Sequence, residues 1–227
     1  MQISEIYVSR QGEGLLTGEP SIFVRTSGCN LRCSFCDTPY TSWSPEGTPM
    51  SIDEVVEVVA GHDEKHVVIT GGEPMLPPAI GALTSRIQSL GKHITIETAG
   101  TISRDIECDL MSISPKLANS TPSVDRAGEW SRKHEESRIN LNVLRELIGR
   151  FKYQLKFVVV NELDVEEIKQ LVESIEADNE RVLLMPEGID KRTLDARKQW
   201  LEDVCEQFGY RFCPRMHIEW YGNKRGK

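Results

Sequence analysis

Short runs of apolar and β-branched residues recur along the chain at wide spacing and predict β-strands. Several are continuously apolar, as is typical of strands buried on both faces of a sheet. The predicted strands cover residues 21–26, 66–70, 93–98, 108–114, 153–160, 181–185 and 210–220. Between most of them, apolar residues recur at three- and four-residue spacing, which predicts helices over residues 51–61, 77–91, 139–150, 165–177 and 194–209.

Helix-start signals support this pattern. Ser51 stands three residues before Glu54, which is the arrangement of a capping box, and Gly61 follows the last apolar position of that helix. Strands that alternate with helices imply right-handed crossovers and a mostly parallel sheet, either open or bent into a barrel. In such α/β sheets the functional residues gather at the carboxyl ends of the strands.

One segment breaks the alternation. Residues 119–138 are polar and charged and poor in β-branched residues, which predicts a long surface loop that leads into the helix near 139–150. Its mixture of charges is typical of a solvated face. No repeat or linker divides the chain, so we expect a single domain over residues 1–227 with a loop and helix insertion around 119–150.

The composition of the chain makes some classes of function less expected. The chain has 227 residues and a formal net charge of -8, with 35 acidic against 27 basic residues. This balance gives no general attraction to a phosphate backbone or an anionic membrane, so direct nucleic-acid binding is not expected. No run approaches the roughly 20 apolar residues of a membrane span, and residues 1–14 lack the features of a signal peptide, so a cytoplasmic protein is expected.

Three of the six cysteines stand close together. Cys29, Cys33 and Cys36 form the pattern C-x-x-x-C-x-x-C, whereas the other three are scattered and expected to be buried and inert. Thiolates so spaced can converge on zinc, copper(I) or an iron–sulfur cluster. A structural zinc site would require a fourth ligand, which no neighbouring cysteine or histidine supplies. Three thiolates on a four-iron cluster leave one iron open to a small molecule.

The cysteine pattern, together with TGGEP after the next predicted strand, resembles the radical S-adenosylmethionine (SAM) superfamily. The resemblance implies a partial, incomplete TIM-like barrel with mostly parallel strands. It also implies a [4Fe–4S] cluster on the three cysteines, SAM on the open iron, and Gly71 and Gly72 beside the SAM amino group. Glycine at such a position lets the main chain approach a ligand closely.

Three further motifs, QGEG (11–14), CDTPY (36–40) and SPK (114–116), resemble the 7-carboxy-7-deazaguanine synthase family. The resemblance implies contraction of 6-carboxy-5,6,7,8-tetrahydropterin with loss of ammonia, in queuosine-type deazapurine biosynthesis. It implies Mg²⁺ on Thr38. It places the pterin against Gln11, Gly12, Glu13, Arg25, Thr70 and His217. It places SAM against Phe35, Cys36, Asp37, Gly72, Glu73, Ser114, Pro115, Lys116, Met185, Pro186 and Glu187.

The family resemblance also implies a homodimer and an electron donor such as flavodoxin or ferredoxin. Two alternatives stay open at this point. A glycyl-radical-enzyme activase has a similar fold and length, but typically shows DGPG in place of QGEG and C-x-N-P in place of CDTP. A non-catalytic iron–sulfur or zinc binding module would have no use for TGGEP or SPK. The tail WYGNKRGK extends beyond the shorter family members, and no motif assigns its action.

Overall fold

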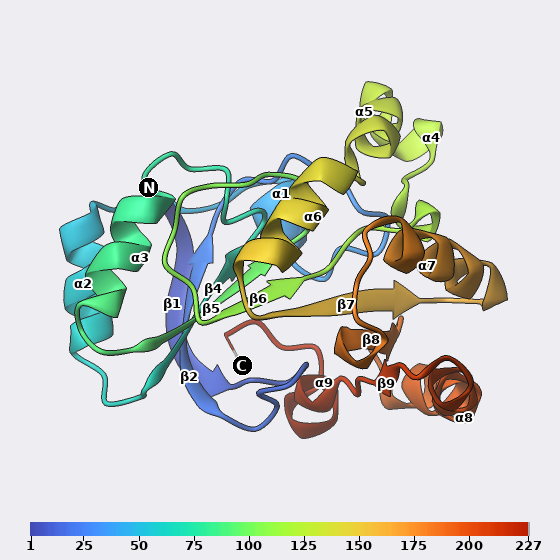
Figure 1. Cartoon of the computed structure of the whole chain (residues 1–227). Helices are drawn as coiled ribbons and strands as arrows, with labels where there is room; N and C mark the ends of the chain where they lie inside the picture. The colour runs from blue at the N-terminus through green and yellow to red at the C-terminus, as the bar shows by residue number, and fades with distance from the viewer. Residues whose placement is uncertain (227) are drawn as a thin grey trace.

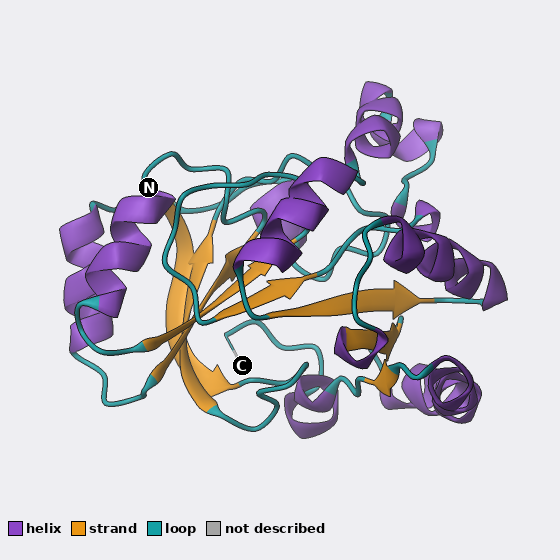
Figure 2. Ribbon diagram, in the orientation of Figure 1, coloured by secondary structure: helices purple, strands orange, loops and turns teal. Residues whose placement is uncertain are grey.

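A single sheet, described over residues 1–226 of this computed structural model, organises the chain (Figures 1 and 2). Its nine strands lie in the order β3-β1-β2-β4-β5-β6-β7-β8-β9. β1 pairs antiparallel with β2 and β3, and every other neighbouring pair is parallel. The strands are β1 Gln2–Arg10, β2 Pro20–Thr26, β3 Thr48–Pro49, β4 His66–Gly71, β5 His93–Thr98, β6 Leu110–Ile113, β7 Tyr153–Val159, β8 Val182–Pro186 and β9 Arg211–Phe212. The sheet is therefore a mostly parallel, open one, which confirms the predicted fold class.

Helices surround this sheet in Figure 1. The α-helices are α1 Pro39–Ser42, α2 Ile52–Ala60, α3 Ile80–Gln88, α4 Val124–Ala127, α5 Glu129–Ser137, α6 Leu141–Arg150, α7 Glu162–Ser174, α8 Lys191–Phe208 and α9 Met216–Tyr221, with short 3-10 turns at η1 Ala118–Ser120 and η2 Asn179–Arg181. The predicted capping box is present at α2, where the Ser51 side chain accepts from the Glu54 N–H and Glu54 accepts in return from Ser51.

The two faces of the parallel sheet differ in chemistry. Side chains alternate between faces along each strand. The outer face packs on the helices and is apolar, with Ile22, Val24, Val67, Ile69, Ile94, Ile96, Met111, Ile113, Leu155 and Phe157 in one core with residues of α2, α3, α6, α7 and α8. The inner face is mostly polar and lines a cavity, with Arg25, Thr70, Glu97, Ser112 and Lys156 among its side chains. The outer face of the strands is therefore covered by helices, whereas the inner face lines the cavity.

One predicted strand is wrong and one strand was missed. Residues 210–220 do not form one strand: β9 ends at Phe212, and α9 begins at Met216. Pro214 lies between them and has no N–H to donate to a sheet ladder. Sequence patterning also missed β1, whose apolar residues are mixed with charged ones and whose burial is only partial.

The predicted loop 119–138 is wrong as well, because most of it is helical in η1, α4 and α5. α5 buries only one side chain, His134, and carries the ion pairs Arg132–Glu136 and Lys133–Glu129 on its exposed side. A helix with a single buried residue has no apolar stripe, so periodicity could not reveal it.

Among residues 1–226, no helix is both long enough and apolar enough to cross a membrane.

Candidate active site

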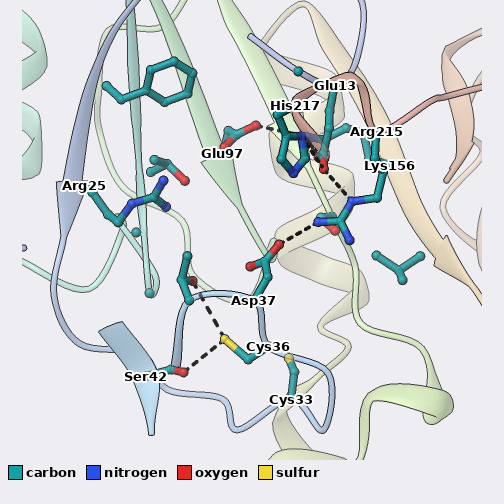
Figure 3. A pocket seen from close by; sticks show the side chains of 18 of the residues that line it. Glu13, Arg25, Cys33, Cys36, Asp37, Ser42, Glu97, Lys156, Arg215 and His217 are labelled. Carbon is teal, nitrogen blue, oxygen red and sulfur yellow. Dashed lines mark hydrogen bonds and ion pairs between the residues drawn. The ribbon is translucent and has the colours of Figure 1, made fainter. Parts of the chain in front are cut away.

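A cavity of about 510 Å³ lies on the inner face of the sheet, at the carboxyl ends of its parallel strands. Its size falls within the range of ordinary small-molecule sites. Figure 3 shows its two ends, with Cys33, Cys36 and Ser42 at one end and Glu13, Glu97, Lys156, Arg215 and His217 at the other.

The cysteine end is built by the loop that follows β2. Cys29, Cys33 and Cys36 all line the cavity and none is in a disulfide. The Cys36 Sγ lies 3.2 Å from Ser42 Oγ and 3.8 Å from Thr38 Oγ1. Burial raises the pKa of Cys29 to about 12 and that of Cys33 to about 11. A cationic iron centre would offset this cost of ionising the thiols.

The spacing of these thiols bears on the kind of metal centre. In residues 1–226, no three His, Cys, Asp or Glu side chains come close enough together to hold one metal ion. A mononuclear zinc site needs such convergence, because each ligand bonds the same ion at about 2.3 Å. A four-iron cluster places each thiolate on its own iron, so the three sulfurs need not converge on one point. The cysteine end supplies three free thiols, which is the donor set that a four-iron cluster with one open iron takes.

Gly71 ends β4, and Gly72 follows it beside the cysteine loop. A Cβ on Gly71, whose φ is +135°, would lie 2.1 Å from the Thr26 carbonyl oxygen, and one on Gly72 would lie 2.1 Å from that of Gly28. Glu73 N–H donates to the same Gly28 oxygen at 2.9 Å. Both glycines line the cavity, and the close approach of the chain leading to Cys29 explains why neither position has room for a side chain.

The charged end is organised by Lys156 and Arg215 (Figure 3). Lys156 Nζ lies 3.2 Å from a Glu13 oxygen and 2.9 Å from one of Glu97. Arg215 Nε lies 3.1 Å from the other Glu13 oxygen, its Nη2 lies 2.7 Å from Asp37, and its Nη1 donates to the Gly188 carbonyl at 2.6 Å. Arg215 thus connects the charged end to the residue that follows Cys36.

These contacts fix the ionisation of Glu13. Burial by itself raises the pKa of this carboxyl, but the Lys156 and Arg215 cations, with His217, outweigh burial and hold the pKa well below its ordinary value. Burial lowers the pKa of Lys156, but Glu97 and Glu13 more than offset it and hold the pKa above its ordinary value. Glu13 is therefore a carboxylate and Lys156 a cation at every physiological pH.

Arg25 reaches the cavity from β2 and is held by its neighbours on β1. Its Nε lies 2.7 Å from Glu5 and its Nη2 donates to the Tyr7 hydroxyl at 2.8 Å. Glu5 also accepts from the Tyr40 hydroxyl at 3.0 Å and pairs with Arg225 at 3.3 Å. The C-terminal tail thus reaches the wall of the cavity that presents Arg25, and residues 223–226 line the cavity.

Gly12 and His217 meet although they are far apart in sequence. A Cβ on Gly12 would lie 2.5 Å from His217 Cβ, and Met216 N–H donates to the Gly12 carbonyl at 2.9 Å. His217 Nδ1 lies 3.8 Å from Glu13. The absence of a side chain at residue 12 therefore lets the C-terminal segment bring His217 against the QGEG loop.

The structure brings together most of the predicted site. All but three of the predicted residues line this one cavity; the exceptions are Glu73, Pro115 and Pro186. Glu73 is fully buried. Its oxygens accept from the N–H groups of Met75 and Ala99 and from the Thr98 hydroxyl, at 2.8 to 3.0 Å. These partners give Glu73 a structural role, and we do not assign it a SAM contact.

Sequence patterning missed several charged residues of the cavity. Glu97 and Lys156 are single charged positions inside predicted strands, and Arg215 lies between the charged residues Arg211 and Glu219, so no local pattern distinguishes any of the three. The signal that could have found Lys156 is its place inside a predicted buried strand, since lysine is rarely buried without a partner.

Comparison with known proteins places the chain among relatives. Residues 23–175 match the radical SAM superfamily. The chain is 48% identical to a 7-carboxy-7-deazaguanine synthase of Rhodopirellula baltica, over 99% of this chain and 88% of that one. It is 44% identical to the enzyme of the same name from Halobacterium salinarum, over 96% of this chain and 89% of that one. The chain belongs to the 7-carboxy-7-deazaguanine synthase family.

A solved structure agrees in fold. The crystal structure of QueE from Escherichia coli superposes with a TM-score of 0.72 at 24% identity, over 95% of this chain and 94% of that one. Membership of the synthase family confirms the predicted resemblance and makes the chain a radical SAM enzyme. Neither the activase nor the non-catalytic module is supported by these relatives.

Proposed function

We propose that the cavity carries out the ring contraction for which the synthase family is named, turning 6-carboxy-5,6,7,8-tetrahydropterin into 7-carboxy-7-deazaguanine with loss of ammonia. The observation that carries this proposal is that the cysteine end and the charged end line one continuous cavity. A substrate at the charged end would lie beside a cofactor at the cysteine end, as hydrogen transfer between two bound molecules requires.

At the cysteine end, a [4Fe–4S] cluster on Cys29, Cys33 and Cys36, with SAM on the iron that they leave open, would supply a 5′-deoxyadenosyl radical. Lys116 is suited to the carboxylate of SAM. Its Nζ donates to Ser114 Oγ at 2.7 Å, and it forms no ion pair with any other residue between 1 and 226. Its charge therefore stays available in the cavity.

The other proposed SAM contacts come from lining residues. Phe35, Asp37, Gly72, Met185 and Glu187 all lie on the cavity wall. Pro115 and Pro186 are buried behind that wall, so we propose that they only support Lys116 and Glu187.

At the charged end, Glu13 suits the donor-rich edge of a pterin. Because Lys156 and Arg215 keep it ionised, Glu13 can only accept hydrogen bonds, and a pterin offers amino and ring N–H donors. His217 and Gln11 border the same space, and Thr70 lies on the β4 wall. Arg25 presents its remaining donors to the substrate carboxylate. Phe23 and Tyr7, stacked with centroids 5.1 Å apart, add a flat apolar surface.

We propose that Thr38 holds a Mg²⁺ ion. Its hydroxyl is a hard oxygen donor on the cavity wall, close to Cys36. Mg²⁺ often takes one or two protein ligands and completes its shell from substrate and water. With Thr38 and the substrate carboxylate as ligands, the ion would orient that carboxylate and favour rearrangement as a Lewis acid.

Two partners complete the proposal. Reduction of the cluster requires a one-electron donor such as flavodoxin or ferredoxin, which is general for radical SAM enzymes. We also expect a homodimer, which sedimentation of the reconstituted protein would test.

The test is anaerobic turnover of reconstituted enzyme with SAM, a reductant, Mg²⁺ and the carboxytetrahydropterin. We expect product from wild type and from Cys108→Ala, a matched control whose cysteine lies outside the cavity, and none from Cys33→Ala. Wild-type protein that carries a cluster and cleaves SAM without consuming the pterin would contradict the proposed substrate. Undiminished product from Cys33→Ala would contradict the proposed cluster ligands.

A further inference from the structure

The polar segment that contains η1, α4 and α5 folds onto the cysteine loop. Ser34, which follows Cys33, is held by three of its groups. Its N–H donates to the Ser120 carbonyl at 2.8 Å, and its hydroxyl donates to the Asn119 carbonyl at 3.2 Å. Its carbonyl accepts from Arg126 Nη1 at 2.5 Å. The residue after Cys33 is therefore bound at every polar group to a segment some 85 to 92 positions away.

His134 holds the residue that precedes Cys33. It is fully buried, and its Nδ1 accepts the backbone N–H of Arg32 at 3.0 Å. Its Nε2 lies 2.9 Å from Ser120 Oγ, whose own hydrogen goes to the Leu117 carbonyl at 2.6 Å. Because Nδ1 accepts and Ser120 Oγ has its proton committed, the neutral ring must carry its proton on Nε2. One tautomer satisfies every contact.

Two tryptophan rings add contacts between this polar segment and the cysteine loop. The Arg32 guanidinium lies 4.0 Å from the centroid of Trp130, and that of Arg126 lies 4.4 Å from the centroid of Trp43. Trp43 Nε1 in turn donates to the Cys33 carbonyl at 3.0 Å. The backbone on both sides of Cys33, and the carbonyl of Cys33 itself, thus have fixed partners.

We propose that residues 118–137 form a clamp that fixes the cysteine loop in the conformation required to hold the iron–sulfur cluster, with His134 as its central positioning residue. This inference rests on the ligand role proposed above for Cys29, Cys33 and Cys36. The sequence of the clamp is polar, like that of a solvated loop. Its proposed function requires polar side chains that hydrogen-bond to the backbone of the cysteine loop, and an apolar stripe would not provide them.

The physical reason is preorganisation. Ligands on an irregular loop have no secondary structure to orient them, so groups outside the ligand shell must do so. Loss of the Nδ1 acceptor would leave the Arg32 N–H without its buried partner, which favours another loop conformation. A cluster held by a looser loop should be lost more readily, even where the fold itself is intact.

The test compares two substitutions of similar size at one position. In His134→Asn, the amide oxygen takes the place of Nδ1 and can still accept from Arg32. In His134→Gln, the amide group takes the place of Nε2 and can reach only Ser120. Each full-length variant keeps one of the two ring contacts, so their thermal midpoints without cluster should be similar.

After anaerobic reconstitution, we expect His134→Asn to retain its cluster nearly as wild type does. We expect His134→Gln to lose iron to a chelator about tenfold faster, as one lost hydrogen bond to a buried group would allow. We also expect the electron paramagnetic resonance signal of its reduced cluster to change less on addition of SAM. Equal cluster retention in the two variants, or better retention in His134→Gln, would overturn the clamp.

A second pair keeps the test decisive if both His134 variants fail to fold. Arg126 and Arg132 are both exposed, but only Arg126 contacts the cysteine loop, whereas Arg132 pairs with Glu136 within α5. Faster iron loss in Arg126→Gln than in Arg132→Gln supports the clamp, and equal rates contradict it. These readouts do not involve the pterin. Wild-type protein that takes up no cluster would instead contradict the proposed function.

Discussion

Lys156 and Phe157 are neighbours on β7 and lie on opposite faces of the sheet. Phe157 is fully buried in the apolar core of the outer face. Lys156 is only 4% exposed, yet it is a cation between Glu13 and Glu97 on the inner face. Both side chains are buried, but the first is stabilised by dispersion and exclusion from water and the second by its ion pairs. Buried side chains on the outer face therefore stabilise the fold, whereas a buried side chain on the inner face, such as Lys156, holds the charged groups of the cavity.

Lys156→Met gives the largest expected effect, because it removes the cation between two carboxylates. Removing one partner of a buried ion pair typically lowers the free energy of unfolding by about 3 to 5 kcal/mol. The displaced Glu13 should also lower kcat/KM for the pterin by about 10²-fold or more. Urea unfolding and steady-state kinetics measure the two effects. A variant with normal kcat/KM would contradict a functional role for the inner-face charges.

Phe157→Ala tests the opposite face at the adjacent residue. It should lower the free energy of unfolding by about 3 to 5 kcal/mol through the cavity that it leaves in the core. Turnover per cluster-loaded, folded molecule should stay near the wild-type rate at a temperature where the variant is folded. A large loss of kcat in the folded variant, without a change in cluster content, would erase the distinction between the faces.

A pH dependence should come from His134, a buried polar group outside the cavity. Burial lowers the pKa of His134 to about 4 from an ordinary value of 6.5. Below pH 6.5 the unfolded chain binds this proton and the folded protein does not, so the free energy of unfolding falls as the pH falls toward about 4.

Urea unfolding of the cluster-free protein at two pH values measures this dependence. Between about pH 7 and pH 5, wild type should lose about 1 to 2 kcal/mol more than His134→Asn, which has no ring to titrate. Equal losses in the two proteins would show that His134 is not held neutral by burial.

Ser51→Ala should have the smallest effect. It removes the capping box of α2, a helix that does not line the cavity, and should lower the free energy of unfolding by about 0.5 to 2 kcal/mol. Turnover and cluster content should be unchanged, as a matched control for the inner-face variants. A change in cluster retention would indicate that α2 is coupled to the cysteine loop.

The same contrast explains how much of the molecule could be predicted. The strands and the helices that cover their outer face have strong apolar patterns. The bounds of most of these elements were therefore predicted to within a few residues. Motif residues such as Cys33 and Gly72 were found because their short-range spacing is itself the signal. Lys156, Glu97 and Arg215 were not, because single charged residues acquire meaning only when the sheet brings distant strands together. The clamp was missed because its longest helix, α5, buries only His134 and so has no apolar stripe.

The central claim is that the charged end holds the pterin beside a SAM-derived radical. Turnover of carboxytetrahydropterin deuterated at C6, under anaerobic conditions with reconstituted wild-type enzyme, tests it most directly. We predict that 7-carboxy-7-deazaguanine forms and that deuterium passes into 5′-deoxyadenosine or SAM, because we propose that the SAM-derived radical removes the hydrogen at C6 of the pterin. Cleavage of SAM with no deuterium transfer and no product would contradict the claim.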